Sequence, residues 1–236
     1  MDLSNFDKYL DWTHGNAVHY DESSDTWLIS LRNQDAVAAF DRGTGDLKWI
    51  LGNHDNWSAE LQPYLLDPVG PLTWQFHQHA AKLDGDRVLM FDNANWGASP
   101  FTGVTDLDVL PEELRTRVVE FKIDETAMTV EQTWELLELS NGDQAQAPAV
   151  GNSAWLENGN VFATWGIASS ISGQSLASMG LGSQGIRLAE FTGDPSGNHV
   201  IHSDVFITIE GALLAEGWQT YRAERIASPY PTGTLR

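Results

Sequence analysis

The chain has 236 residues, of which 42% are hydrophobic, so it can bury the core of one large all-β domain or two small ones. Thirty-three acidic residues against thirteen basic ones give a formal charge of −20, which argues against nucleic acid and anionic membranes as partners. The absence of cysteine excludes a disulfide framework and a thiolate metal site.

The N-terminal segment, residues 1–16, has neither the basic region nor the apolar region of a signal peptide. No stretch approaches the roughly 20 apolar residues that a membrane span needs. We therefore expect no export signal here and no insertion into a membrane. An anionic protein that binds an anionic substrate needs positive charge at its site, which makes the few Arg and His residues informative.

Short β-type runs separated by polar turns begin near the start of the chain. The first group has one strand that ends at Tyr20, two strands at residues 27–32 and 36–41, and a fourth at 47–51. A second and a third group follow the same plan. Their predicted strands are residues 80–83, 87–93, 117–124 and 130–136, then 153–156, 161–166, 186–192 and 200–207.

Longer connections interrupt these groups. Residues 58–72 and 106–117 are insertions between strands, and the Pro-Glu-Glu-Leu run at 111–114 predicts a short helix. Residues 167–185 form a Gly/Ser-rich loop. Residues 217–226 have the character of the opening strand of a fourth group.

Four antiparallel strands joined by Asn, Asp and Gly turns make one blade of a β-propeller. The repeat predicts an all-β chain with about three to three and a half four-stranded blades, which form one partial propeller domain over residues 1–236. Propellers usually close with about four to eight blades. We expect missing N-terminal blades or another chain to complete the ring, and we favour a fragment of a longer protein.

Polar residues are concentrated where the groups open, at residues 11–16, 75–81 and 218–222. Equivalent positions in successive blades converge on the propeller axis, so His14 and His79 are expected to face one cavity. Arg32 lies on the second predicted strand of the first group and supplies a permanent cation.

Several ordered segments carry a resemblance to a known family. They are DWTHGNAVHYD, LISLRNQDAVAAFDRGTGDLKWILG, QHAAKL, MFDNAN, RVVEFKIDETAMTVEQTWE and TYRA. Together they resemble the arylsulfate sulfotransferases over most of the chain. The resemblance implies a six-bladed propeller that moves a sulfuryl group from an aryl sulfate to a phenol through a sulfurylated histidine, without a nucleotide donor or other cofactor. It also implies a periplasmic or extracellular location.

The family motifs fall on particular residues of this chain. The nucleophile falls on His79, and the His and Asn of the D-W-x-H-x-N motif fall on His14 and Asn16. The family arginine falls on Arg32, and a late polar pocket residue falls near Thr220. A further family histidine belongs to a blade that precedes residue 1 and has no counterpart here.

These residue types suit sulfuryl transfer, which resembles phosphoryl transfer in its loose transition state and its charged peripheral oxygens. A neutral imidazole such as His79 is a competent nucleophile. Arg32 can hold sulfate oxygens in a bidentate manner, and Asn16 can donate a hydrogen bond to them. Protonated His14 can donate its proton to the leaving phenolate and later deprotonate the incoming phenol, which gives a ping-pong cycle.

Other interpretations of these residues stay open. His77 shares the face of His79 if both lie on one strand, so it can line the channel or act as the nucleophile after a register shift. Trp74, Trp96 and Asn93 lie next to the histidine segments and are candidates for substrate contact, although core packing is the default for the tryptophans. Instead of binding sulfate, Arg32 could form a surface ion pair with a nearby aspartate.

Two other functional classes compete with the enzyme. A non-catalytic propeller arc would bind partners without turnover. A metal site built from His14, His77 and His79 is the other alternative, with a carboxylate from Asp11 or Asp92 as a further ligand.

Overall fold

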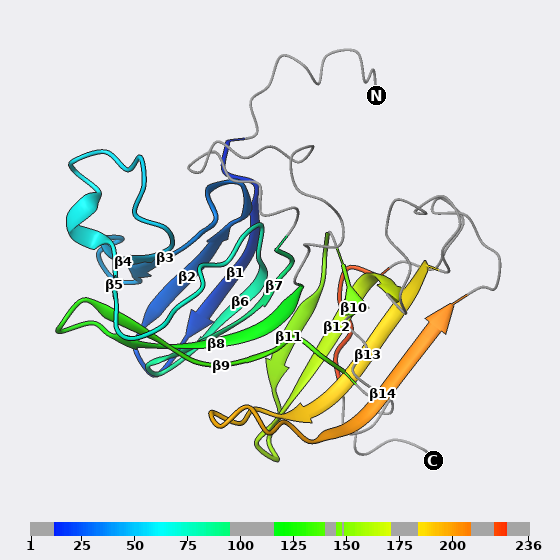
Figure 1. Ribbon diagram of the computed structural model, residues 1–236. Helices are drawn as coiled ribbons and strands as arrows, with labels where there is room; N and C mark the ends of the chain where they lie inside the picture. Colours follow the sequence, from blue (N-terminus) through cyan, green and yellow to red (C-terminus); the bar gives the residue numbers. More distant parts are fainter. Residues whose placement is uncertain are drawn as a thin grey trace, which may run out of the picture.

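The computed structural model describes residues 12–94, 116–139, 145–147, 149–170, 184–208 and 220–225. Within these ranges the regular elements are strands, apart from two short 3-10 turns. The strands form three sheets that stand side by side as an arc (Figure 1). None of the described residues belongs to a helix long and apolar enough to cross a membrane.

The first sheet is an antiparallel meander in the order of the chain. Its strands are β1 (Gly15–Asp21), β2 (Thr26–Leu31), β3 (Ala36–Asp41) and β4 (Leu47–Leu51). Local turn chemistry accounts for this plan, since the Asp41 carboxylate accepts a hydrogen bond from the Thr44 backbone N–H at 2.8 Å. The sheet confirms the first predicted group, although Arg32 follows β2 instead of lying on it.

The second sheet repeats this plan with β6 (His79–Asp84), β7 (Arg87–Asp92), β8 (Arg117–Asp124) and β9 (Thr129–Leu136). A two-residue strand, β5 (Asp67–Pro68), pairs in parallel with β9 at the outer edge. It comes from the insertion at residues 58–72, which the sequence analysis left without strands. The expected helix at 111–114 lies outside the described residues.

The third sheet contains β11 (Asn152–Trp155), β12 (Asn160–Ser170), β13 (Gln184–Thr192) and β14 (Ile201–Thr208), with β10 (Ala145–Gln146) paired to the far end of β12. The predicted loop at 167–185 is too long at both ends. The β12–β13 ladder continues past a register shift after Trp165 and pairs Ala168 with Gly185. A bulge lets a strand bend without ending, which sequence periodicity does not reveal.

The two larger hydrophobic clusters of the described residues form layers, one on each side of the second sheet, and a third, smaller cluster contains Ala36, Ala38, Ile50 and Leu65. Met90 of β7 packs toward the first sheet with Trp49 and Phe121, all of them fully buried. Its neighbour Phe91 points the other way and meets the Trp165 ring edge-on, with the ring centroids 5.5 Å apart. Alternate residues of a strand face opposite sides. Burial of each such side chain contributes roughly 2–3 kcal/mol.

The first strands of the three sheets are neighbours, since β1 contacts β6 and β6 contacts β11. Sheets arranged in this way are propeller-like blades, so the all-β partial propeller is confirmed and the described sheets do not close into a barrel. The described part of the expected fourth opening strand, residues 220–225, has no strand ladder. This segment lies against the third sheet instead, where the Thr220 N–H donates to the Gly166 carbonyl of β12 at 3.0 Å.

Candidate functional site

His79 is the first residue of β6, and only 3% of its surface is exposed. Its Nδ1 lies 2.6 Å from Oδ1 of Asn93 and 3.2 Å from the backbone carbonyl of His77. Its ring lies edge-on to that of Tyr221, with the centroids 6.1 Å apart. The imidazole is therefore anchored through Nδ1, and no described residue forms a hydrogen bond with Nε2.

Burial lowers the pKa of His79 from 6.5 to about 4, because a charged ring would lose its hydration. The positive charges of Arg32 and His14 lower this pKa further, while the bonds to Asn93 and to the His77 carbonyl act in the opposite direction. The ring is thus neutral near pH 7. A neutral ring retains the lone pair that a nucleophile needs.

Asn93 follows β7 and is completely buried. Its Nδ2 donates to the backbone carbonyls of Ala147 and Val150 at 2.7 and 2.8 Å, which directs Oδ1 toward His79. Its own carbonyl accepts a hydrogen bond from Thr116 Oγ1 at 2.9 Å. The sequence analysis proposed Asn93 as a substrate contact, whereas the structure places its side chain beneath His79, away from solvent.

Two backbone hydrogen bonds bring His14 and Arg32 to the same end of the first sheet. The N–H groups of Arg32 and Asn33 donate to the carbonyls of His14 and Thr13, each at 3.2 Å. The Arg32 guanidinium also donates to Oδ1 of Asn33 at 2.8 Å. Arg32 opens a 3-10 turn that ends at Asp35, whose φ of 49° turns the chain back into β3.

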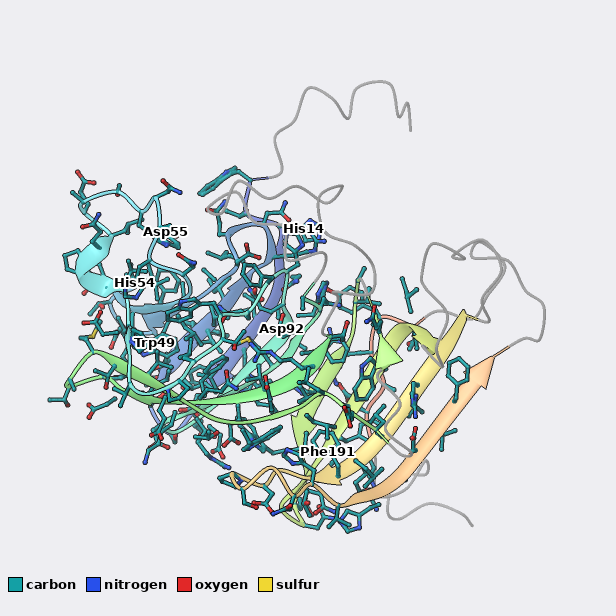
Figure 2. The ribbon with its side chains drawn as sticks, viewed as in Figure 1. His14, Trp49, His54, Asp55, Asp92 and Phe191 are labelled. Carbon is teal, nitrogen blue, oxygen red and sulfur yellow. The ribbon has the colours of Figure 1, made fainter. Side chains whose placement is uncertain are left out.

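His14 lies at the start of β1 with an exposed side chain (Figure 2). Asn16 follows at an irregularity in the β1–β2 register between Gly15 and Ala17. Its Nδ2 donates to the Gln78 carbonyl at 2.7 Å, and its buried Oδ1 has no hydrogen-bond partner among the described residues. Asn16 therefore adjoins the backbone that leads into His79 and retains an acceptor.

The loop that leads into His79 is fastened to the first sheet by two buried glutamines that the sequence analysis did not identify. Nε2 of Gln75 donates to the carbonyls of Asp35 and Leu51, both at 3.0 Å. Nε2 of Gln78 donates to the Ala36 carbonyl at 2.8 Å. A segment held at several points keeps the His79 side chain in place.

His77 does not share a strand face with His79, because β6 begins only at His79. His77 is buried, and its backbone N–H donates to Oδ1 of Asp35 at 2.6 Å. The register shift in β6 lies between His79 and Lys82, after the nucleophile candidate and not before it. His77 therefore precedes β6, and the register shift of this strand does not bring it to the position of His79.

Strained backbone is concentrated around the site. His14, His77, Ala80 and Val150 have φ values of 44°, 54°, 53° and 56°. Residues with a Cβ rarely adopt this left-handed region, and each such residue costs on the order of 1 kcal/mol or more. Conformations of this kind persist where the surrounding structure demands them, often at functional sites.

Residues 220–225 add a wall that the sequence analysis located only in part. The Thr220 hydroxyl donates to the Arg222 carbonyl at 2.8 Å. Tyr221 is 47% exposed and its hydroxyl donates to the Asn16 carbonyl at 3.1 Å, so its ring extends across to the first two sheets. Tyr221 belongs to the TYRA segment, but nothing in that segment distinguished it from Thr220.

Trp74, a candidate for substrate stacking, is partly buried. It packs against the first core layer and contacts the His54 ring, with the centroids 5.6 Å apart. Figure 2 shows His54 at the opposite side of the first sheet from His14. Trp96, the other tryptophan considered for substrate stacking, lies outside the described residues.

Asp92 and Arg117 form a buried ion pair beneath the site, with Oδ2 and Nε 2.8 Å apart and side chains only 1% and 3% exposed. Oδ1 of Asp92 also accepts the backbone N–H groups of Phe76 and Ala94 at 3.0 and 2.9 Å. Asp92, a ligand in the metal alternative, is thus occupied, and Asp11 is outside the described ranges. Over those ranges, no group of three His, Cys, Asp or Glu side chains is arranged to hold a metal.

The arc of blades and the buried neutral histidine beside Arg32 and His14 define a propeller protein with a site suited to a nucleophile and an anionic ligand. Comparison with known protein families identifies the family of this propeller protein. The model of the arylsulfotransferase (ASST) family matches residues 2–204, so the chain belongs to that family.

Two curated relatives carry the name arylsulfate sulfotransferase AssT. The protein from Lelliottia amnigena is 31% identical over 144 residues, which cover 52% of this chain and 22% of the relative. The protein from Escherichia coli O6:H1 (strain CFT073) is 31% identical over 142 residues with the same coverage. The matched region thus spans about a fifth of the length of these relatives.

Among solved structures, a putative 6-phosphogluconolactonase from Bacteroides fragilis aligns with a TM-score of 0.38 and 12% identity. The alignment covers 85% of this chain and 40% of the other.

Proposed function

We propose that the chain carries the nucleophile of an arylsulfate sulfotransferase, which moves a sulfuryl group from an aryl sulfate to a phenol through sulfurylated His79. The observation that carries the proposal is the state of His79. Its ring is neutral and anchored through Nδ1, and the charges of Arg32 and His14 lie close enough to affect its pKa. Membership of the arylsulfotransferase family supports the same chemistry.

In the first half-reaction, the Nε2 lone pair of His79 attacks the sulfur of the aryl sulfate. The new N–S bond forms as the S–O bond to the aryl group breaks, and the phenolate departs with that electron pair. Protonated His14 donates a proton to the phenolate, which leaves as a phenol. Arg32 balances the charge on the peripheral sulfate oxygens.

The second half-reaction reverses these steps with another phenol. Neutral His14 removes the phenol proton, and the phenolate oxygen attacks sulfur. The N–S bond breaks, its electron pair returns to Nε2, and His79 is again neutral. Because the two substrates use one site in turn, the kinetics are ping-pong.

The remaining residues shape the substrate site. Nδ2 of Asn16 retains one hydrogen beyond its bond to the Gln78 carbonyl, which suits it to donate to a sulfate oxygen. The half-exposed ring of Tyr221 gives the aryl group an aromatic surface beside His79. His77 lines the site through its backbone carbonyl, which lies against Nδ1 of His79, and Thr220 precedes Tyr221 in the wall of the site. Trp74 stays in the first core layer in this proposal.

A non-catalytic binding arc is the second candidate, and exposed apolar residues on the terminal sheets favour it. Val18 and Trp27 of the first sheet are 68% and 39% exposed, and Val205 and Ile207 of the third are 48% and 43% exposed. Such surfaces mark contacts with other protein segments. We propose that further blades or another chain cover them.

The family resemblance further supports a periplasmic or extracellular location.

The enzyme proposal is tested by following 4-nitrophenol release from 4-nitrophenyl sulfate with phenol as acceptor. His79→Ala and Arg32→Ala are expected to abolish transfer, whereas His202→Ala, on an exposed position of β14, is expected to retain it. Circular dichroism checks that each variant is folded. Full transfer by folded His79→Ala would refute the mechanism, and absence of transfer by the intact protein would favour the binding arc.

A further inference from the structure

We propose that Asn93 is the positioning residue of this site, and that it holds His79 in the tautomer with the proton on Nδ1 so that Nε2 faces the substrate. The catalytic consequence rests on the proposed function. The tautomer is a property of the folded chain and can be measured without turnover.

The hydrogen bonds around Asn93 determine which of its side-chain atoms faces the ring. Both hydrogens of Nδ2 are directed to backbone carbonyls, of Ala147 at 2.7 Å and of Val150 at 2.8 Å. A carbonyl only accepts, so Nδ2 belongs on that side and Oδ1 belongs on the side of His79. The 2.6 Å contact from Oδ1 to Nδ1 then requires a proton on Nδ1.

The other possible arrangements each place acceptors against acceptors. With the proton on Nε2, the Nδ1 lone pair would face Oδ1 of Asn93 and the carbonyl of His77. If the Asn93 amide were reversed, its Oδ1 would face the carbonyls of Ala147 and Val150. A buried polar group without its partner costs about 1–3 kcal/mol, and 1.4 kcal/mol corresponds to about a tenfold change in population. One tautomer therefore dominates.

Neighbouring residues support the hydrogen bond between Asn93 and His79 from both sides, so this bond is formed before substrate binds. Thr116 Oγ1 donates to the Asn93 carbonyl at 2.9 Å and accepts the Ala147 N–H at 3.1 Å. Val150 supplies its carbonyl from a backbone at φ 56°, a conformation that β-branched residues strongly disfavour. Asn93 thus links the second sheet to the segment that precedes the third.

The hydrogen bond between Asn93 and His79 also stabilises the sulfurylated intermediate. When the sulfuryl group joins Nε2, the ring gains positive charge while Nδ1 keeps its proton. The hydrogen bond to Asn93 then has a charged donor, and such bonds are stronger than neutral ones. Asn93 consequently stabilises the sulfurylated ring more than the free ring without contacting the substrate.

The test is nitrogen-15 NMR of the histidine-labelled intact protein, in which protonated and unprotonated ring nitrogens have well-separated shifts. We expect a protonated Nδ1 and an unprotonated Nε2 for His79 in the wild type. In Asn93→Leu we expect a mixture of tautomers and transfer slowed by about 10- to 100-fold, by analogy with the partners that orient metal-ligating histidines.

Thr26→Val is the control, because Thr26 is equally buried and its hydroxyl donates to the Ser24 carbonyl, at the end of the first sheet away from His79. We expect the wild-type tautomer in this control even where stability falls. A proton on Nε2 in the wild type would overturn the proposal, and this holds even if Asn93→Leu does not fold. An unchanged tautomer and rate in folded Asn93→Leu would also overturn it. The expected tautomer without any sulfuryl transfer would refute the proposed function alone.

Discussion

Burial of His79 makes the folded chain sensitive to acid, and replacing this residue with glutamine isolates the effect. The pKa of His79 is lowered from 6.5 to about 4, so the unfolded chain takes up the proton first as the pH falls. Stability is complete above about pH 6.5 and declines as the pH falls toward 4. The difference between 6.5 and about 4, at about 1.4 kcal/mol for each pH unit, is about 3–4 kcal/mol, of which about 3 kcal/mol is lost by about pH 4.

Urea unfolding followed by tryptophan fluorescence, at several pH values from about 7 to about 4, measures this directly. All other titrating groups are common to the wild type and His79→Gln, so they largely cancel in the difference. We expect the wild type to lose about 3 kcal/mol more than the variant over this range. A difference that stays constant with pH would show that His79 is not held in its neutral form by burial.

Three further substitutions have expected outcomes. Gly166→Ala places a Cβ 1.9 Å from the carbonyl oxygen of Thr220, so we expect residues 220–225 to separate from β12 and amide exchange at Thr220 to accelerate. Tyr221→Ala is expected to raise KM for aryl sulfates more than Tyr221→Phe, which keeps the ring and loses only the hydrogen bond to a backbone carbonyl. Asp92→Asn leaves Arg117 without its more buried charge partner and is expected to cost about 3–5 kcal/mol in urea unfolding, since it breaks a buried ion pair.

The blades were predictable because their signals are local. Most turns carry Asn, Asp or Gly, and each buried strand has a run of apolar residues, as in β3 (Ala36–Asp41) and β7 (Arg87–Asp92). The short strands β5 and β10 were missed because they have two residues each and depend on a distant partner. The extension of β12 depends on a bulge, which leaves no periodic trace in the sequence.

The site was predictable only as far as its segments could be recognised. The structure brings His14, Asn16 and Arg32 to the same region as His79, as the motif order implied. The arrangement of Asn93 was not accessible, because its carbonyl partners lie 54 and 57 positions further along the chain. Contacts of this range depend on how the sheets pack, and sequence spacing carries no information on them.

Sulfurylation of His79 can be measured most directly by peptide mapping of the intact protein. The protein is mixed with 4-nitrophenyl sulfate without an acceptor, quenched under alkaline conditions and digested for mass spectrometry. We expect one sulfuryl group on Nε2 of His79, absent from His79→Ala and lost when phenol is added. A sulfuryl group on His77 or His14 instead, or transfer to phenol with no adduct on the protein, would contradict the role of His79 as the nucleophile.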